Sequence, residues 1–309
     1  MNIIIETIIL VVCFVVMCQG AGWLVDSSAR IARKLGVSNL VIGLTIVAFG
    51  TSAPELCVSI SAAIRGAGDI SIGNIIGSNI FNIGIILGGV AIIRNLKTDD
   101  QMIHRDGFFL MVVTLVAVAM LWDLRLSRFE GMVLFLLLLF YLGNLYSSRA
   151  VSPEIDLEAD NFRFRDIFLL TLSTAMLIGS SHFLVNSACN LARTFGCSEW
   201  LIGATIVAAG TSLPEMVTSI VAAIRGNSGI SIGNLIGSDI FNVLGVLGLA
   251  GIIREMPIET SARISLLIYP FMVGIALVFL RTEWKLTRRE GIVLVLFGIA
   301  RWVYSIIAQ

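Results

Sequence analysis

The clearest shortage in this 309-residue sequence is charge. Lys and Arg total 21, Asp and Glu total 21, and charged residues make up 14% of the chain against 57% hydrophobic residues. Soluble domains carry about 25% charged residues, so the chain has too little polar surface for a soluble or a disordered protein. The zero net charge argues against a nucleic-acid partner, which needs a basic face. A helical protein surrounded by a lipid bilayer is the class that remains.

Cysteine and basic residues at the N-terminus are scarce as well. The five cysteines form no Cys-x-x-Cys pair, which argues against a disulfide scaffold or a zinc site and predicts small buried side chains. No Lys or Arg precedes the apolar run 3–25, and Glu6 lies inside it. This run is therefore expected to span the membrane, not to act as a signal peptide.

The sequence contains an internal repeat. Residues 43–94 align without a gap to residues 203–254, at an offset of 160, with 33 identities in 52 positions. We divide the chain into a first half (1–149), a linker (150–162) and a second half (163–309). The shared motifs are G-T-S-x-P-E at 50–55 and 210–215, S-I-G-N at 71–74 and 231–234, and G-S-x-I-F-N at 77–82 and 237–242.

Each half contains five apolar segments, so we expect an all-α polytopic membrane protein. An odd number of spans inverts the second half relative to the first, which predicts ten transmembrane helices in two inverted five-helix repeats. With both termini outside, the cytoplasmic loops hold 14 Lys and Arg and the outer loops hold 6, as the positive-inside rule requires. The segments cover about residues 3–33, 39–64, 70–93, 104–121 and 128–147, then 163–193, 199–224, 230–253, 261–280 and 288–308.

The second and seventh helices are expected to be broken near the membrane centre. Pro54 and Pro214 remove a backbone donor there. The Ser-x-x-Glu pattern at 52–55 and 212–215 matches a capping box, so a new half-helix is predicted to begin at each serine. Backbone carbonyls just before each break are expected to lack helical partners, which a membrane tolerates only where the backbone lines a cavity or binds a ligand.

Two acids lie at this depth. A carboxylate at the bilayer centre costs at least ~2.5–3.5 kcal/mol on insertion scales, so Glu55 and Glu215 are expected to do more than cap a helix. The third and eighth segments add Ser and Asn pairs four residues apart, on one helix face. Every collected ligand atom is an oxygen, without His, Cys or Lys, which predicts a site for the hard cations Ca²⁺ or Na⁺. Mutually exclusive occupancy by two ions is the minimal basis of antiport.

Small residues accompany the polar ones on the third and eighth segments. Gly73 and Gly77, and again Gly233 and Gly237, form small-xxx-small pairs that let helices approach closely. We expect these glycines to position the site without forming part of it.

The two copies of G-T-S-x-P-E, each followed by G-S-x-I-F-N, resemble the alpha repeats of the sodium/calcium exchanger superfamily over essentially the whole chain. The resemblance implies an antiporter that moves Ca²⁺ against Na⁺ by alternating access, without a cofactor, while the long first and sixth segments slide against the other eight. It implies ion ligands at Ala48 (carbonyl), Thr51, Ser52, Glu55, Ser78 and Asn82, and at Ala208 (carbonyl), Thr211, Ser212, Glu215, Ser238 and Asn242.

Two positions depart from the pattern. Some members of the superfamily carry Asp at the position of Asn242, and in potassium-dependent members that acid is linked to potassium. Asn82 and Asn242 therefore put potassium dependence in doubt and leave two formal negative charges. Asp239 breaks the symmetry with Asn79; it either faces the ion path as an additional ligand or is a partner for Ser, Asn or a backbone amide.

Three alternatives remain at this level. Proton/calcium exchange, or exchange of another divalent cation, would use the same site, because a buried glutamate can also take up a proton. An intramembrane hydrolase would need a Ser–His or a paired Asp arrangement, which the repeated core lacks. A passive channel would bind a divalent ion less tightly. We further expect a monomer in a prokaryotic inner membrane, since the short linker has no room for a regulatory domain.

Overall fold

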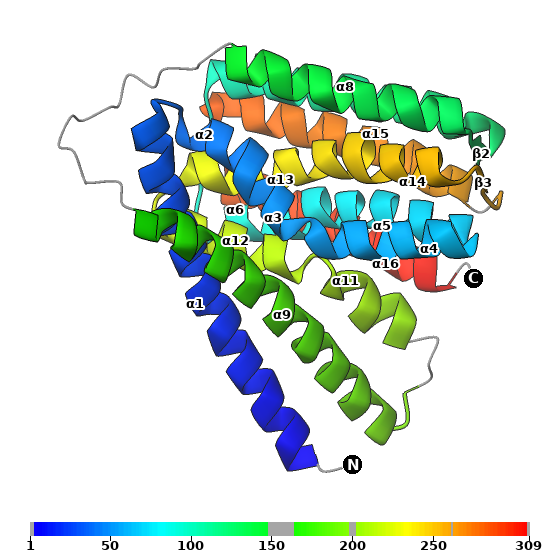
Figure 1. The fold of residues 1–309 in the computed structure, drawn as a ribbon, viewed down its shortest axis with the longest axis horizontal. Coiled ribbons are helices and arrows are strands. Elements are labelled where there is room, and N and C mark those ends of the chain that lie inside the picture. Colours follow the sequence, from blue (N-terminus) through cyan, green and yellow to red (C-terminus); the bar gives the residue numbers. More distant parts are fainter. Residues whose placement is uncertain (1–2, 148–163, 198–201, 261, 308–309) are drawn as a thin grey trace.

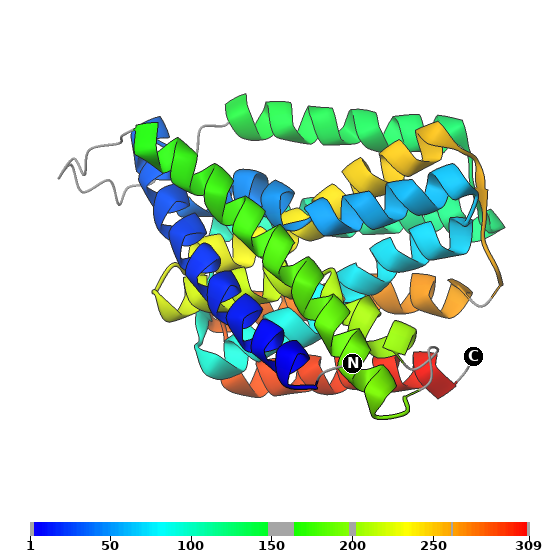
Figure 2. The ribbon, with the colours of Figure 1, turned by 60° about the horizontal axis from the view of Figure 1, so that its bottom comes forward.

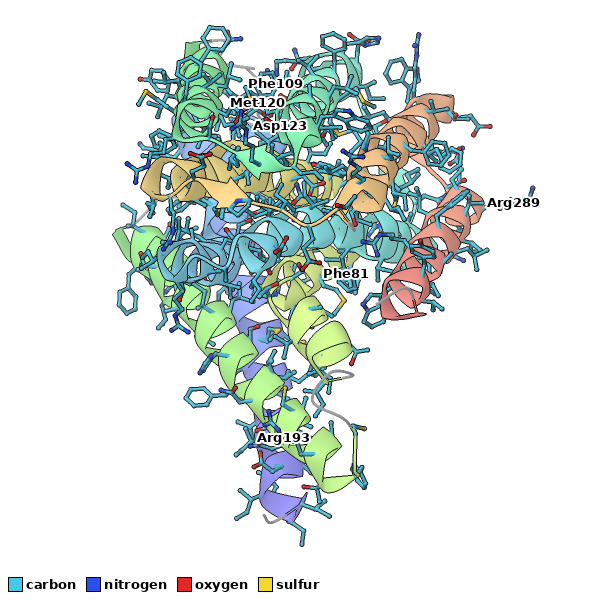
Figure 3. The ribbon with its side chains drawn as sticks, turned by 90° about the vertical axis from the view of Figure 1, so that its right-hand side faces the viewer. Phe81, Phe109, Met120, Asp123, Arg193 and Arg289 are labelled. Atoms are coloured by element: carbon cyan, nitrogen blue, oxygen red, sulfur yellow. The ribbon has the colours of Figure 1, made fainter. Side chains whose placement is uncertain are left out.

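A computed structural model describes residues 3–147, 164–197, 202–260 and 262–307. These residues are almost entirely helical. Figure 1 shows a bundle crossed obliquely by two long helices, α1 (Ile3–Leu35) and α9 (Phe164–Thr194), which lie side by side in Figure 2 as well. In the end-on view of Figure 3 both helices extend away from the bundle, with Arg193 on the extension of α9. The predicted linker 150–162 lies outside the described residues.

The first half contains five helical segments, close to their predicted bounds. α1 is followed by a segment made of α2 (Asn39–Ile42), a π-helical turn (Gly43–Val47), α3 (Ala48–Thr51) and α4 (Ala53–Arg65). The third segment is α5 (Gly68–Phe81), a π-helical turn (Asn82–Leu87) and α6 (Gly88–Ile93). Then come β1 (Leu96–Lys97), a π-helical turn (Met102–Gly107), α7 (Phe108–Met120), a 3₁₀ turn (Leu121–Asp123), β2 (Arg125–Leu126) and α8 (Arg128–Ser147).

The second half repeats this order. α9 is followed by a π-helical turn (Gly203–Val207), α11 (Ala208–Gly210) and α12 (Leu213–Ile224). The next segment is α13 (Ser228–Phe241), a π-helical turn (Asn242–Leu247) and α14 (Gly248–Ile253). The half ends with β3 (Met256–Pro257), α15 (Ala262–Arg281), a 3₁₀ turn (Thr282–Trp284), β4 (Lys285–Leu286) and α16 (Arg288–Ile307).

Length and hydropathy qualify much of this bundle for a membrane. Seven of the described helices are long and apolar enough to cross a bilayer, or eight if the bent pair Asn39–Thr51 and Ala53–Arg65 counts as one span. The all-helical, membrane-spanning character predicted from the sequence is therefore confirmed. The large apolar side chains that remain exposed, such as Phe129, Phe140 and Phe168, suit a lipid surface.

Short strands join the two halves at both ends of the bundle. β1 pairs antiparallel with β4, and β2 pairs antiparallel with β3. β2 and β3 lie at the end where the chain terminates (Figure 1), whereas β1 and β4 belong to the opposite end, because one helical segment separates β4 from that terminus. We call the first end the terminal side and the opposite end, where α8 stops and α9 starts, the linker side.

Arginines also connect the halves, each to the C-terminus of a helix in the other half. Arg94 donates to the Ile224 carbonyl (2.8 Å) and Arg128 to the Ile253 carbonyl (3.4 Å). Their counterparts, 160 residues along the chain, are Arg254 on Ile64 and Arg288 on Ile93. A cation at a helix C-terminus satisfies free carbonyls and the helix dipole. The repeated arginines therefore hold two interlocked halves together, not two separate domains.

The cysteines do not all follow their prediction. Cys189 is buried, but Cys57 is exposed and the other three are half-buried. The prediction of burial is wrong for Cys57 because α4 presents this side chain on a face that other helices leave uncovered.

Candidate functional site

The site is built on the breaks in the second and seventh segments. The two parts of the second segment meet at an angle of 50°. Ser52 and Ser212 have nearly the same non-helical conformation, with φ −79° and ψ 7° at Ser52 and φ −88° and ψ 8° at Ser212. In both halves a proline follows at the start of the next helix, where its missing N–H is no loss.

The expected capping boxes at these serines are wrong. Neither side chain caps its own helix. Instead, the Ser52 hydroxyl donates to Glu215 Oε1 (3.1 Å) and the Ser212 hydroxyl donates to Glu55 Oε1 (3.0 Å). Each serine thus binds the glutamate of the other half, because the packing of the two halves brings the two helix starts together. Both glutamates are fully buried.

True capping boxes occur elsewhere in the repeat. The backbone N–H of Ser127 donates to Glu130 Oε2 (2.8 Å) and that of Glu130 donates to Ser127 Oγ (3.3 Å). Thr287 and Glu290 form the same two bonds (2.8 and 3.5 Å). The same sequence pattern therefore caps helices at the ends of the bundle and forms a cross-half bond at its centre. Packing between the halves decides which of the two occurs.

The carbonyl of Ala48 is not free. It accepts the backbone N–H of Ser52 (3.0 Å) and the hydroxyl of Thr51 (3.3 Å). The prediction that this carbonyl lacks a helical partner is wrong, because α3 continues to Thr51 before the chain turns. Its counterpart Ala208 is exposed, whereas Ala48 is buried, so the two halves differ here.

The hydroxyls predicted as ligands gather around the glutamates. Thr51 Oγ1 donates to Asn234 Oδ1 (3.0 Å) and lies 3.4 Å from Ser238 Oγ. The amide of Asn242 donates to Ser78 Oγ (3.4 Å). The Thr211 hydroxyl is buried and has no hydrogen-bond partner among the described residues. Residues from both broken segments and from both third segments thus meet at one place.

Asp239 lies beside this cluster. The Asn82 amide donates to Asp239 Oδ1 (3.0 Å), and the symmetric Asn242 amide donates to Asn79 Oδ1 (3.0 Å). Asp239 is fully buried. Its first oxygen is the partner of an Asn side chain, which was one of the two expectations from the sequence, and its second oxygen has no hydrogen-bond partner.

Unpaired oxygens concentrate in the site. Buried polar atoms are normally hydrogen-bonded, yet five carboxyl or amide oxygens here have no hydrogen-bond partner among the described residues. An oxygen ligand set without a donor is what a metal cation requires. The five atoms are Glu55 Oε2, Glu215 Oε2, Asn82 Oδ1, Asn242 Oδ1 and Asp239 Oδ2.

The other buried acids have evident partners. Asp106 receives two bonds from Arg105 (3.0 Å each), Asp166 receives one from Arg30 (2.7 Å), and the Asn190 amide donates to Glu6 (3.0 Å). These three acids are stabilised in place by cations or amides. Glu55, Glu215 and Asp239 differ because each keeps one buried carboxylate oxygen without a hydrogen-bond partner among the described residues.

Sequence reasoning missed Asn74 and Asn234. The Asn234 amide donates to Ser219 Oγ (3.0 Å) and to the Glu215 carbonyl (3.4 Å). Asn74 makes the same two bonds to Ser59 and Glu55 in the first half. Both asparagines hold the backbone at a site glutamate. The repeated S-I-G-N motif was the available signal.

Known proteins with similar sequences include ion exchangers. The family model described as "Sodium/calcium exchanger protein" matches residues 5–146 and 166–306. Sodium/calcium exchanger MaX1 of Methanosarcina acetivorans is 34% identical over 343 aligned positions, covering 96% of this chain and 97% of the relative. Inner membrane protein YrbG of Escherichia coli is 32% identical, covering 93% of this chain and 91% of the relative.

A solved structure supports the same assignment. The sodium-calcium exchanger NCX_Mj, soaked with 10 mM Na⁺ and no Ca²⁺, superposes with a TM-score of 0.87 at 31% identity, covering 97% of this chain and 98% of that one. The matching family, MaX1 and NCX_Mj are ion exchangers and not enzymes, which removes the hydrolase alternative. The chain belongs to the sodium/calcium exchanger family of antiporters.

Proposed function

We propose that this antiporter exchanges Na⁺ for Ca²⁺ by alternating access at the Glu55–Glu215 site. The observation that carries the proposal is the pair of buried carboxylates, one from each half, each with one oxygen bonded to a serine of the other half and one oxygen unpaired. Two carboxylates balance the charge of one Ca²⁺. The ions are substrates, and we expect no other cofactor.

The predicted ligands divide into two groups. We assign Ca²⁺ to Glu55 and Glu215 with Thr51, Thr211 and the Ala48 and Ala208 carbonyls, where the ion would take the place of the Thr51 hydroxyl on the Ala48 carbonyl. The Na⁺ ions would use Ser52, Ser212, Ser78 and Ser238, with Asn82 and Asn242 between the third segments. Ser52 and Ser212 are bonded to the glutamates, so Na⁺ that recruits these hydroxyls takes them from the calcium site. Shared oxygens make the two occupancies mutually exclusive.

The architecture we infer is ten spans in two inverted repeats. α16 supplies a further helix of 20 residues, and α11 and α12 follow the π-helical turn Gly203–Val207. Each of the two strand pairs joins one half to the other. Such pairing at both ends is what inverted halves would produce.

The two halves are packed differently, which supports alternating access. On the linker side, a Cβ placed on Gly233 would lie 2.6 Å from the Leu40 carbonyl oxygen, and one on Gly237 would lie 2.7 Å from Leu44 Cα. On the terminal side, a Cβ on Gly73 or Gly77 would meet no atom of the described residues within 4 Å. Helix α13 is thus closed against α2 and its π-helical turn, while the same face of α5 is open.

Side-chain burial shows the same asymmetry. Ile230 of α13 is 0% exposed and its counterpart Ile70 of α5 is 60% exposed. Val47 is 0% exposed and its counterpart Val207 is 46% exposed. The linker side is closed and the terminal side is open in this conformation. Exchange of the two packing states between the halves would turn the site to the other side.

The proposed orientation in the membrane follows from the distribution of basic residues. The excess of Lys and Arg in the linker-side loops supports a cytoplasmic location for that side, and the described conformation would then face outward. A relative named as an inner membrane protein supports the inner membrane of a prokaryote. We propose a monomer, because the site is assembled within one chain.

Coupling to sodium is tested by calcium uptake into proteoliposomes. Vesicles loaded with Na⁺ and diluted into Na⁺-free buffer should take up radioactive calcium, and vesicles with only a pH gradient should not. Uptake driven by the pH gradient alone would replace sodium with protons. Steady downhill calcium flux without any counter-ion would indicate a channel.

Asp239 should tune the sodium sites without being required for calcium. Asp239→Asn removes the third buried carboxylate and makes the position equal to Asn79. We expect the Na⁺ concentration for half-maximal exchange to rise by about tenfold, the low end of the effect of outer ligand groups on ion affinity. Sodium titration of exchange measures it. Asp123→Asn, on the surface, is the control, and an unchanged sodium dependence in Asp239→Asn would show that the acid only holds Asn82.

A further inference from the structure

One ion pair on the linker side has no equivalent on the terminal side. Arg225, immediately after α12, forms an ion pair with Asp26 of α1 and donates to the Gly22 carbonyl (2.6 Å). The approach is close enough that a Cβ on Gly22 would lie 2.5 Å from Arg225 Nη2. Gly22 and Asp26 are four residues apart, so they present one face of α1 to the guanidinium.

The sequence repeat lacks this contact in its second copy. The counterparts of Gly22, Asp26 and Arg225 are His182, Asn186 and Arg65. His182 occupies the position that Gly22 leaves open, and its Nε2 lies 3.0 Å from Asn186 Nδ2. Asn186 carries no charge for Arg65, which is exposed. The terminal side therefore has neither the space nor the carboxylate for the same ion pair.

Both partners of Arg225 lie on α1, which is expected to move together with α9. α1 and α9 are joined near both ends, by Arg30 with Asp166 (2.7 Å) and by Asn190 with Glu6 (3.0 Å), and these two contacts are repeat counterparts. They connect α1 to α9 only. The Asp26–Arg225 pair connects α1 to the end of α12, next to the start of α13, where the linker side is closed.

The closed packing lies beside this ion pair. Met17, Ala21 and Val25 of α1 form one apolar cluster with Val217 of α12 and Ile230 of α13. The counterparts of these last two, Cys57 and Ile70, are exposed on the terminal side. The ion pair thus closes the rim of the apolar contact that must open when the site turns to the linker side.

We infer that Asp26 and Arg225 form a one-sided ion-pair lock that holds the linker side closed and biases the exchanger toward the state open on the terminal side. The inference rests on the alternating access proposed above. Because the repeat supplies no equal pair at the other end, the two orientations of the site differ in stability. Breaking the pair therefore favours opening toward the linker side.

The test uses two cysteine reporters in a cysteine-free background. Ile230→Cys reports the linker-side contact and Ile70→Cys reports the terminal side. Purified protein in lipid nanodiscs exposes both sides to a maleimide reagent. In Asp26→Asn or Arg225→Gln, the alkylation rate at position 230 should rise two- to fivefold, as expected from a half-exposed ion pair, and the rate at position 70 should fall. The charge exchange Asp26→Arg with Arg225→Asp should restore the original rates.

Arg65→Gln is the matched control at the other end and should change neither rate. A merely structural contact would raise alkylation at both reporters together, which would overturn the inference, as would unchanged rates in both Asp26→Asn and Arg225→Gln. A wrong assignment of the transport mechanism can be distinguished from a wrong assignment of the ion pair. If the protein does not work by alternating access, the wild type would not couple sodium to calcium transport in proteoliposomes. If only the role of the ion pair is wrong, wild-type exchange stays intact.

Discussion

Replacing Glu55 or Glu215 by glutamine should reduce calcium transport by at least about 100-fold. Loss of groups that only support metal ligands costs about 10–100-fold in metal affinity, and these carboxylates are proposed to contact the ion directly. Glutamine keeps the shape and can still accept the bond from Ser212 or Ser52, so the change removes charge and little else. Sodium-driven uptake of radioactive calcium into proteoliposomes is the measurement.

The chain offers a matched control for this substitution. Glu130 occupies a Ser-x-x-Glu pattern like that of Glu55 but caps a helix at the end of the bundle. Glutamine serves equally well in a capping box, so Glu130→Gln should transport normally. Substantial calcium transport by Glu55→Gln or Glu215→Gln would contradict a calcium site made of these two carboxylates.

Replacing Gly237 or Gly77 by alanine should slow exchange at least about tenfold. The two variants should favour opposite conformations of the exchanger. Gly237→Ala puts a Cβ 2.7 Å from Leu44 in the closed contact. Overpacking of this kind costs about 1–3 kcal/mol, so the linker side should open. Gly77→Ala meets no described residue in this conformation but would obstruct the same contact once formed on the terminal side, and so should hold the linker side closed.

The reporters Ile230→Cys and Ile70→Cys distinguish the two outcomes. Gly237→Ala should raise alkylation at position 230, and Gly77→Ala should raise it at position 70. Gly143→Ala, on α8 with open space around it, controls for a general effect of alanine. Full transport activity in Gly77→Ala would argue that α5 never closes as α13 does, and hence against symmetric alternating access.

Much of this fold is predictable because the repeat is strong. Apolar length defines the helical segments, and Pro54 and Pro214 define the breaks. Oxygen side chains at equal positions in both halves define the site. These features can be predicted from one sequence because they depend only on local patterns and on the repeat at an offset of 160 residues.

What the sequence does not disclose depends on contacts between the halves. Ser52 and Glu55 match a capping box as closely as Ser127 and Glu130 do, and only the packing of one half against the other gives Ser52 and Ser212 a glutamate from the other half. The bond from Thr51 to Asn234 depends on the same packing. The difference between a closed α13 and an open α5 is a property of one conformation, which nearly identical motifs cannot encode.

Equilibrium binding of radioactive calcium to the purified protein, in competition with sodium, tests directly whether the two ions use one site in turn. The shared-oxygen site predicts one Ca²⁺ per chain, displaced completely by Na⁺ and absent in the Glu55→Gln, Glu215→Gln double variant. Calcium binding that persists at saturating Na⁺, or that survives in the double variant, would contradict a single site used in turn by the two ions.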